Sequence, residues 1–294
     1  MELYLLIILG ILSACLLCCT LTCIGCCCST SSFKKKIKAE IESTAEIIQT
    51  KNGPVEVNRR GNAPYALCLH GTPGVHDGKL NYFNFLTDNG VGIIAPSRPG
   101  YGRTPLTSGK THEQAADLMA ALLDSLNIDK VVVIGTSGGG TTAFNFALRH
   151  PDRCAGCMTE VAVSGDFNHP KIEELQSFFS KSSMTSPFTA RMTGYVASRK
   201  PEMMVNMMMD EMSLFKGPDK EAQVKEIIND PERIKLLGKM MDEVAGFSIY
   251  PNTADAMVND LNEFVKPINF AEIKVPTLVV HGNMDGDIPF SQAE

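Results

Sequence analysis

The chain has 294 residues and a formal net charge of −6 at pH 7. This length allows one large core plus an insertion or an anchor, and the acidic balance argues against nucleic acid as the main partner. Seven of the 10 cysteines lie between residues 15 and 28, which leaves Cys68, Cys154 and Cys157 for the globular part. We therefore expect a reduced core rather than a disulfide scaffold. Cys154 and Cys157 have no second cysteine pair to complete a zinc site, so we expect no metal there and treat them as strand residues.

The N-terminal stretch predicts a membrane anchor. Residues 3–33 carry no charge and Leu3 to Cys28 is almost wholly apolar, whereas about 20 apolar residues suffice for a helix to cross a bilayer. A basic segment follows, and the positive-inside rule then predicts a single-pass anchor with the downstream domain on the cytoplasmic side. Its lysines are Lys34, Lys35, Lys36 and Lys38. Two alternatives stay open: Leu12-Ser13-Ala14-Cys15 looks like a bacterial lipoprotein cleavage box, and the boundary cysteines are candidates for S-acylation.

The globular part alternates apolar strands with helical segments. Asn52-Gly53 predicts a hairpin between strands at Ala39–Thr50 and Pro54–Arg60. Thr111 and Gln114 form a capping box ahead of apolar residues at helical spacing. Strands separated by helices predict an α/β fold, with a mostly parallel central sheet and helices on both faces. Further strands are predicted at Tyr65–Leu69, Val91–Ala95, Val131–Ile134, Gly156–Val163 and Val275–Val280.

The segment from Val131 to His150 has the order of strand, sharp turn and helix. Its turn contains a Gly-x-Ser-x-Gly motif, with Gly135, Ser137 and Gly139 at the fixed positions, and this context is that of a nucleophile elbow. In such a turn Ser137 adopts strained backbone geometry that lifts its hydroxyl out of the sheet, and the two glycines stand where a Cβ would collide. The following helix directs its positive end towards any anion formed at Ser137.

Strand character is absent between Asp166 and Val275, where prolines stand at expected helix starts. These are Pro170, Pro201, Pro218 and Pro231. The region is also rich in methionine, which fills irregular apolar space. Two interpretations stay open: core packing among short helices, or a flexible apolar lid over a site for a greasy substrate. We divide the chain into an anchor (1–33), a basic linker (34–45), a first part of the core (46–165), a helical cap (166–270) and a second part of the core (271–294).

Four motifs lie at predicted strand ends. They are His70-Gly71-Thr72-Pro73-Gly74, Arg98-Pro99-Gly100-Tyr101-Gly102, the Ser137 turn, and His281-Gly282 with Asp285 and Ile288-Pro289. Together and in this order, they resemble the α/β-hydrolase fold superfamily from about residue 55 to the end of the chain. The resemblance is specific for the superfamily but not for a substrate, and its helical cap corresponds to Asp166 through about Phe270.

The resemblance implies a role for several residues. Ser137 is the nucleophile, and the backbone N–H groups of Gly138 and Thr72 are the two oxyanion donors. Asp285 matches the acid that orients a catalytic histidine. Asp166 occupies the alternative acid position that some members of the superfamily use.

The catalytic histidine of the superfamily has no counterpart in the sequence. The histidines are His70, His76, His112, His150, His169 and His281. His70 is expected to hold the oxyanion loop, and His76 or His169 could approach the site without matching the usual position of the base. The last strand and helix are missing as well, so the Val275–Val280 strand should be an uncovered edge. We expect a shortened sequence rather than a hydrolase-like protein that has lost catalysis, although both stay open.

The leading hypothesis is a membrane-anchored serine hydrolase that cleaves an ester or an amide through an acyl-enzyme. The anchor and the Met-rich cap favour an apolar, lipid-like ester as the small-molecule substrate. No metal or organic cofactor is expected, because neither a ligand cluster nor a phosphate loop is present. The alternatives are a catalytically inactive binding or scaffold protein with a hydrolase-like body, and a cofactor-free perhydrolase or carbon–carbon hydrolase built on the same triad.

Overall fold

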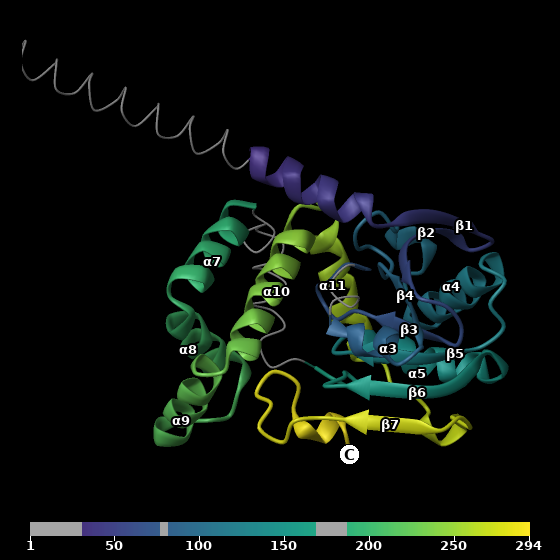
Figure 1. The fold of residues 1–294 in the computed structure, drawn as a ribbon. Coiled ribbons are helices and arrows are strands. Elements are labelled where there is room, and N and C mark those ends of the chain that lie inside the picture. The colour runs from purple at the N-terminus through teal and green to yellow at the C-terminus, as the bar shows by residue number, and fades with distance from the viewer. Residues whose placement is uncertain (1–30, 77–81, 169–186) are drawn as a thin grey trace, which may run out of the picture.

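The computed structural model describes residues 31–76, 82–168 and 187–294, which form a sheet flanked by helices and a helical lobe at one end of it (Figure 1). The seven strands follow the order β1-β2-β4-β3-β5-β6-β7. Pairing is antiparallel from β1 through β2 to β4 and parallel across the rest of the sheet. The strands are β1 (Glu46–Thr50), β2 (Gly53–Arg60), β3 (Tyr65–Leu69), β4 (Gly92–Pro96), β5 (Val131–Thr136), β6 (Cys154–Glu160) and β7 (Thr277–Val280).

The predicted hairpin is present, but its first strand is shorter than expected. Residues 31–43 are helical and β1 begins only at Glu46, so the prediction of a strand from Ala39 was wrong. The basic linker predicted at 34–45 is thus mostly helical. Lys36 pairs with Glu40 one turn further along, at 3.8 Å, and this spacing supports a helix. Ile37 and Ile41, also four residues apart, turn the same face of the helix towards the body.

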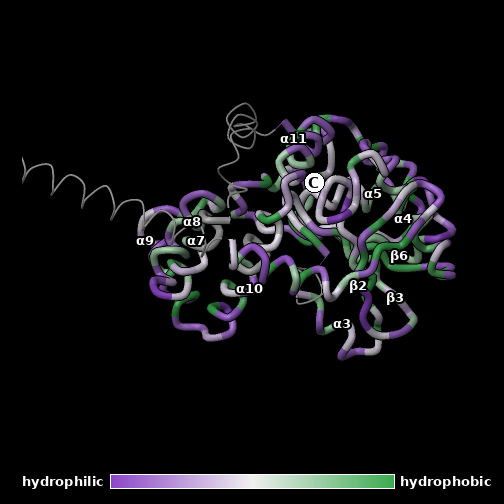
Figure 2. The backbone as a smooth tube through the Cα atoms, turned by 90° about the horizontal axis from the view of Figure 1, so that it is seen from above, coloured by the Kyte–Doolittle hydropathy of each residue, from purple (hydrophilic) through white to green (hydrophobic). Residues whose placement is uncertain are grey.

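Helices cover both faces of the sheet. Strand β3 illustrates this, because its apolar side chains alternate between the two faces and pack on each. Leu67 and Leu69 pack with buried residues of α4 (His112–Ser125) and α5 (Gly139–Arg149). Ala66 and Cys68 pack on the opposite face with Phe83, just before α3 (Asn84–Asp88). The α/β fold class with a mostly parallel sheet is confirmed, and in Figure 2 hydrophobic residues concentrate along the strands.

Two local predictions about α4 and β6 are confirmed. Thr111 accepts a hydrogen bond from the Gln114 backbone N–H, and the Gln114 side chain completes the capping box of α4. Cys154 and Cys157 are free, buried residues of β6. Burial raises the pKa of the Cys157 thiol to about 12, so this side chain behaves as a small apolar residue of the core.

The helices between β6 and β7 form the lobe, and prolines mark their starts. Pro201 and Pro231 begin α8 and α10, and Pro218 is the second residue of α9; Pro170 lies outside the described residues. These helices are α7 (Pro187–Arg199), α8 (Pro201–Met212), α9 (Gly217–Ile228), α10 (Pro231–Ser248) and α11 (Thr253–Phe264). Short 3₁₀ helices lie at Leu106–Ser108, Pro151–Arg153, Phe270–Glu272 and Phe290–Gln292. α11 differs from the others because it packs on Tyr101 and Val163 of the core.

Strand β7 is an edge of the described sheet, as predicted. It pairs with β6 only, and Leu278, Val279 and Val280 are 57%, 41% and 43% exposed. The predicted membrane segment falls almost wholly within residues 1–30, outside the described part of the chain. Among the helices that the structure does describe, none combines the length and the apolar character needed to span a membrane.

Candidate active site

Ser137 occupies a sharp turn between β5, which ends at Thr136, and α5, which begins at Gly139. Its φ of 50° lies in the left-handed region, which is costly for a residue with a Cβ. Three backbone hydrogen bonds hold this conformation. Ser137 donates its N–H to Glu160 at 3.0 Å, and its carbonyl accepts from Gly140 at 2.9 Å and from Val163 at 3.1 Å. Ser137 as a residue stays partly exposed, so the strained turn leaves it accessible from solvent.

The glycines of the motif allow the chain to fold back tightly. A Cβ on Gly135 would come within 2.7 Å of the Ala143 Cβ, and one on Gly139 within 2.5 Å of the His70 carbonyl oxygen. Real Cβ atoms do not approach other atoms so closely, so larger residues would open the turn. The predicted order of strand, turn and helix is therefore confirmed together with its glycine requirement.

Thr72 lies directly against this turn. A Cβ on Gly138 would collide with the Thr72 Oγ1, and one on Gly71 would lie 3.0 Å from the Ser137 Cβ and 3.5 Å from its Oγ. Within the described residues, the amide N–H groups of Thr72 and Gly138 donate to no other group of the protein. The structure thus brings the predicted nucleophile and both predicted oxyanion donors together.

Asp285 lies on the loop after β7. Its Oδ1 accepts the backbone N–H groups of Asp287 at 2.9 Å and Ile288 at 2.8 Å, which fixes the carboxylate in the turn. Glu160 of β6 pairs with Thr136 on one side and with Val280 on the other. Strand β6 therefore lies between β5 and β7, and the loops that carry Ser137 and Asp285 both follow the carboxyl ends of these parallel strands.

Asp166, the alternative acid, follows β6 and is exposed, with a φ of 50°. Its backbone N–H donates to the Lys266 carbonyl at 3.2 Å. It stands at the start of the segment that leads into the helical lobe.

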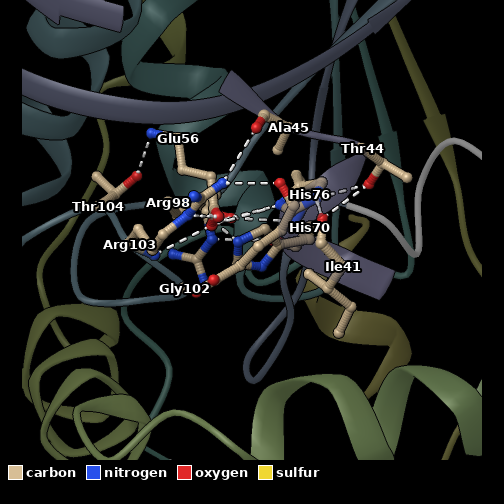
Figure 3. A network of polar contacts seen from close by, with 12 residues as sticks. Ile41, Thr44, Ala45, Glu56, His70, His76, Arg98, Gly102, Arg103 and Thr104 are labelled. Atoms are coloured by element: carbon tan, nitrogen blue, oxygen red, sulfur yellow. Dashed lines mark hydrogen bonds and ion pairs between the residues drawn. The ribbon is translucent and has the colours of Figure 1, made fainter. Parts of the chain in front are cut away.

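The described histidines are engaged elsewhere. The His70 Nε2 accepts the Arg98 backbone N–H at 2.9 Å, so the proton lies on Nδ1, which faces the Gly71 carbonyl at 2.8 Å. This arrangement holds the oxyanion loop, as expected. His76 is fully buried against Ser97 and Glu56, with its Nε2 3.3 Å from the Ile41 carbonyl oxygen (Figure 3).

The remaining histidines also lie in other environments. His112 is buried with its Nδ1 3.0 Å from the Thr141 Oγ1, and burial lowers its pKa to about 4. His150 faces Asp117 at 2.8 Å. The His281 Nε2 lies 2.9 Å from the Ile288 carbonyl oxygen and 3.9 Å from the Asp285 Oδ2. His169 lies outside the described residues. None of the described histidines hydrogen-bonds to Ser137.

A buried acid that the sequence analysis missed lies beside the oxyanion loop. Asp260 of α11 is 5% exposed and accepts hydrogen bonds from Arg98 at 2.7 Å, from the Tyr101 hydroxyl at 2.7 Å and from the Thr72 hydroxyl. Burial opposes the charge of Arg98, but the Asp260 carboxylate outweighs this effect and raises the pKa of Arg98. Burial and Asp260 together raise the pKa of Tyr101 well above its usual value.

The sequence did contain a signal for Asp260. It falls in the buried stripe of α11, whose members recur every three or four residues: Ala256, Met257, Asp260, Leu261 and Phe264. A carboxylate in an apolar stripe requires a buried partner. The arginine of the second motif was the candidate, since no role had been assigned to it.

With this geometry established, comparison with known proteins gives the family. A model of the alpha/beta hydrolase fold matches residues 67–291. The chain therefore belongs to the α/β-hydrolase fold family.

Individual relatives agree with this family. The uncharacterized hydrolase YcgS of Bacillus subtilis is 27% identical over 256 residues, which cover 84% of each chain. The structure of an alpha/beta hydrolase fold protein from Nakamurella multipartita superposes with a TM-score of 0.72 at 30% identity, over 84% of each chain. A 2-hydroxy-6-oxo-6-phenylhexa-2,4-dienoate hydrolase of Burkholderia cepacia is 24% identical over 249 residues, 81% of this chain and 77% of that one. These similarities support a hydrolase of this fold.

Proposed function

We propose that this chain is a membrane-anchored serine hydrolase that cleaves an ester through an acyl-enzyme. One observation carries the proposal: the strained turn presents the Ser137 hydroxyl beside two amide N–H groups, those of Thr72 and Gly138, that have no partner within the described residues. Preorganised donors at the point where negative charge develops are worth about 10²- to 10³-fold each in rate. An amide remains a second substrate for the same chemistry.

In the proposed reaction the Ser137 Oγ attacks the ester carbonyl carbon and its proton passes to a general base. The carbonyl oxygen becomes an oxyanion, which the Thr72 and Gly138 amides stabilise together with the positive end of α5. The intermediate collapses with loss of the alcohol, which takes the proton from the base, and water then repeats the sequence on the acyl-enzyme. Asp285 would orient this base. None of the described histidines hydrogen-bonds to Ser137, so none of them is placed to act as the base.

An apolar cavity in the helical lobe is evidence for an apolar substrate. It has a volume of about 320 Å³, within the ~300–1,000 Å³ typical of small-molecule sites. Its wall continues into the Asp285 loop, because Gly286 donates its N–H to the Met212 carbonyl at 3.1 Å and Leu214 donates to Met284 at 2.9 Å. We therefore propose that the cavity accepts an alkyl chain of the ester. Residues of its wall include Val205, Met208, Met209, Met212, Leu237 and Met240.

Filling this cavity should change chain-length preference. In Met209→Trp the larger side chain occupies space that a long acyl chain would use. If about two methylenes are displaced, at ~0.8 kcal/mol each, kcat/KM for p-nitrophenyl laurate falls about 10-fold, while that for the butyrate stays within about 2-fold. Met207 is the matched control, because it lies on the same helix but is 53% exposed and does not line the cavity. Equal losses for both esters in Met209→Trp, or the same laurate loss in Met207→Trp, would disprove the assignment.

The anchor remains part of the proposal. Residues 3–33 have the length and composition of a membrane segment. Residues 31–43 form a helix that packs on the body. Ile37 and Ile41 of this helix contact the cluster of Val75, Ile249 and Tyr250, whereas Lys34, Lys35, Lys36 and Lys38 are exposed. We propose that these lysines face anionic headgroups on the cytoplasmic side.

A fluorophosphonate probe tests the enzyme and the anchor together. With imidazole added as the proton acceptor, the full chain should form one adduct on Ser137, which mass spectrometry of the labelled peptide identifies. The labelled protein should stay in the membrane fraction after an alkaline carbonate wash. Ser137→Ala should abolish the adduct and Ser164→Ala should not. An unlabelled Ser137 would favour the scaffold alternative, and release by carbonate would rule out the anchor.

A second reaction on the same residues has support from one relative. The Burkholderia cepacia protein is by name a dienoate hydrolase and aligns over 81% of this chain. The same nucleophile and oxyanion donors would serve carbon–carbon hydrolysis. Faster turnover of such a dienoate than of any p-nitrophenyl ester would favour this reading over ester cleavage.

A further inference from the structure

The carboxylate of Asp260 joins the helical lobe to the loops that build the candidate active site. It projects from the middle of α11 and meets three core side chains, Arg98, Tyr101 and Thr72, which all follow strand ends. Two guanidinium nitrogens of Arg98 take part, with Nη2 at 2.7 Å from Oδ2 and Nη1 at 3.3 Å from Oδ1. Arg98 is only 2% exposed and Tyr101 is fully buried, so this is a desolvated, multiply bonded charge pair.

Arg98 extends this contact to the backbone of the oxyanion loop. Its Nε donates to the His70 carbonyl at 2.8 Å, and its Nη2 donates to the Gly71 carbonyl at 3.0 Å and to the Thr72 hydroxyl at 2.8 Å. The peptide that carries the Thr72 N–H begins at the Gly71 carbonyl carbon. The guanidinium therefore fixes the peptide plane whose N–H is the proposed oxyanion donor.

The second donor is held from the same helix. Phe264 lies one turn beyond Asp260 on α11, and a Cβ on Gly138 would come within 2.7 Å of its ring. The Thr72 side chain closes the other side of Gly138. One face of α11 thus packs against both residues that carry the proposed oxyanion donors, whereas no hydrogen bond joins Asp260 to Ser137.

We infer that Asp260 is a positioning residue that holds the Thr72 amide in register with the Gly138 amide through Arg98 and the Thr72 hydroxyl. A carboxylate this close to a developing oxyanion would repel it if unpaired, and the Arg98 charge cancels that repulsion while its donors set the loop. Preorganisation of this kind matters because a shift of about 1 Å at a reacting group can cost about 10²-fold in rate.

The test measures the rate constant for phosphonylation of Ser137, which depends on the oxyanion site, at one fixed imidazole concentration for all variants. KM for p-nitrophenyl butyrate is measured in parallel. Asp260→Asn removes the charge and leaves Arg98 unpaired. We expect the labelling rate constant to fall about 10²-fold while KM changes by no more than about 2-fold, because Asp260 is only 5% exposed and its carboxylate is occupied by Arg98, Tyr101 and Thr72. An unchanged labelling rate in a folded Asp260→Asn protein would overturn the inference.

Two further variants remain informative if Asp260→Asn does not fold. Thr72→Val keeps the amide and the shape but removes the hydroxyl that bonds to Asp260 and Arg98, and should slow labelling about 10-fold. Thr72→Ser keeps the hydroxyl and should restore the rate to within about 3-fold of the wild type. Equal rates for Thr72→Val and the wild type would overturn the inference.

Glu56→Gln is the matched control for lost stability. Glu56 is an equally buried carboxylate with an arginine partner, Arg103, and it does not touch Thr72. The Glu56→Gln variant should have a lower melting temperature and an unchanged labelling rate constant. If its labelling rate constant fell as much as that of Asp260→Asn, the effect of Asp260 would be one of stability alone. Because the inference presupposes the serine-hydrolase proposal, the wild type is measured first. An unlabelled wild-type Ser137 defeats that proposal, whereas a labelled wild type with an unaffected Asp260→Asn defeats only the inference.

Discussion

The 294-residue chain is expected to hydrolyse p-nitrophenyl acetate with a kcat below about 10⁻² s⁻¹, and added imidazole is expected to raise the rate only while Ser137 is present. Typical enzymes turn over near ~10 s⁻¹, and loss of a triad member costs at least about 10³-fold. The physical reason is that a serine hydroxyl is a weak nucleophile without an adjacent base. The turn and the two amides would still provide the oxyanion part of the rate.

Imidazole in solution can act as the proton acceptor that none of the described histidines provides to Ser137. A rate that is linear in imidazole concentration and at least about 10-fold above that of Ser137→Ala at the highest concentration would identify Ser137 as the group activated. Ser137→Ala corrects for the reaction of imidazole with the ester itself. His169→Ala is the second control, because His169 is the one histidine outside the described residues. Turnover at ordinary enzyme rates that His169→Ala abolishes would mean that the chain already contains its base.

The sequence was sufficient for the parts of this site that local chain geometry determines. A run of β-branched residues followed by Gly-x-Ser-x-Gly leaves few conformations other than a strand, a tight turn and a helix, and this arrangement is what Ser137 occupies. The position of the oxyanion loop was also predictable, because its motif follows a strand that lies next to β5 and runs parallel to it. Parallel neighbours bring their carboxyl ends to one edge, so Thr72 and Gly138 had to meet there.

Side-chain partners distant in sequence were not predictable in the same way. Asp260 and Arg98 are 162 residues apart, and only the packing of α11 on the sheet edge brings them together. The N-terminal helix was missed because apolar residues at 37 and 41 fit a short strand as well as a helix over so few residues. What decided its conformation was docking: Arg103 donates to the Ala45 carbonyl at 3.1 Å and to the Glu42 carbonyl at 3.5 Å at the end of the helix.

The same arginine leads to the second buried charge cluster of the fold, centred on Glu56 of β2 (Figure 3). Its Oε1 accepts from the Arg103 Nε at 2.5 Å, and its Oε2 accepts from the Ser97 hydroxyl at 2.8 Å and from the Arg103 backbone N–H at 3.0 Å. His76 lies 3.4 Å from the same oxygen. Burial alone would raise the pKa of Glu56, but the hydrogen bonds and charge of His76, together with the N–H groups of Arg103, lower it to about 2.

Glu56→Gln should therefore reduce the free energy of unfolding in a manner that depends on pH. In the unfolded chain the Glu56 carboxyl titrates near its ordinary value of 4.5, and in the folded protein near about 2. Because the folded-state pKa is the lower one, the stabilisation is fully present above about pH 5 and is lost as pH falls through 4.5 towards 2. This pKa difference corresponds to about 3 kcal/mol. Urea titrations of wild type and variant at several pH values measure it.

At pH 7 the free energy of unfolding of Glu56→Gln should be about 3 kcal/mol below that of the wild type. This difference should shrink towards pH 2, because the wild-type carboxylate then becomes protonated and is as neutral as the glutamine. Glu46→Gln is the matched control: it removes another carboxylate paired with an arginine, at 2.5 Å from Arg59, but that pair is 49% and 41% exposed. Solvent screening limits such a pair to about 0.5 kcal/mol with little dependence on pH. Two results would contradict this prediction: a loss of unfolding free energy in Glu56→Gln that stays constant down to pH 3, or a loss no larger than that of Glu46→Gln. Either would mean that charge in the buried cluster does not hold the N-terminal helix on β2.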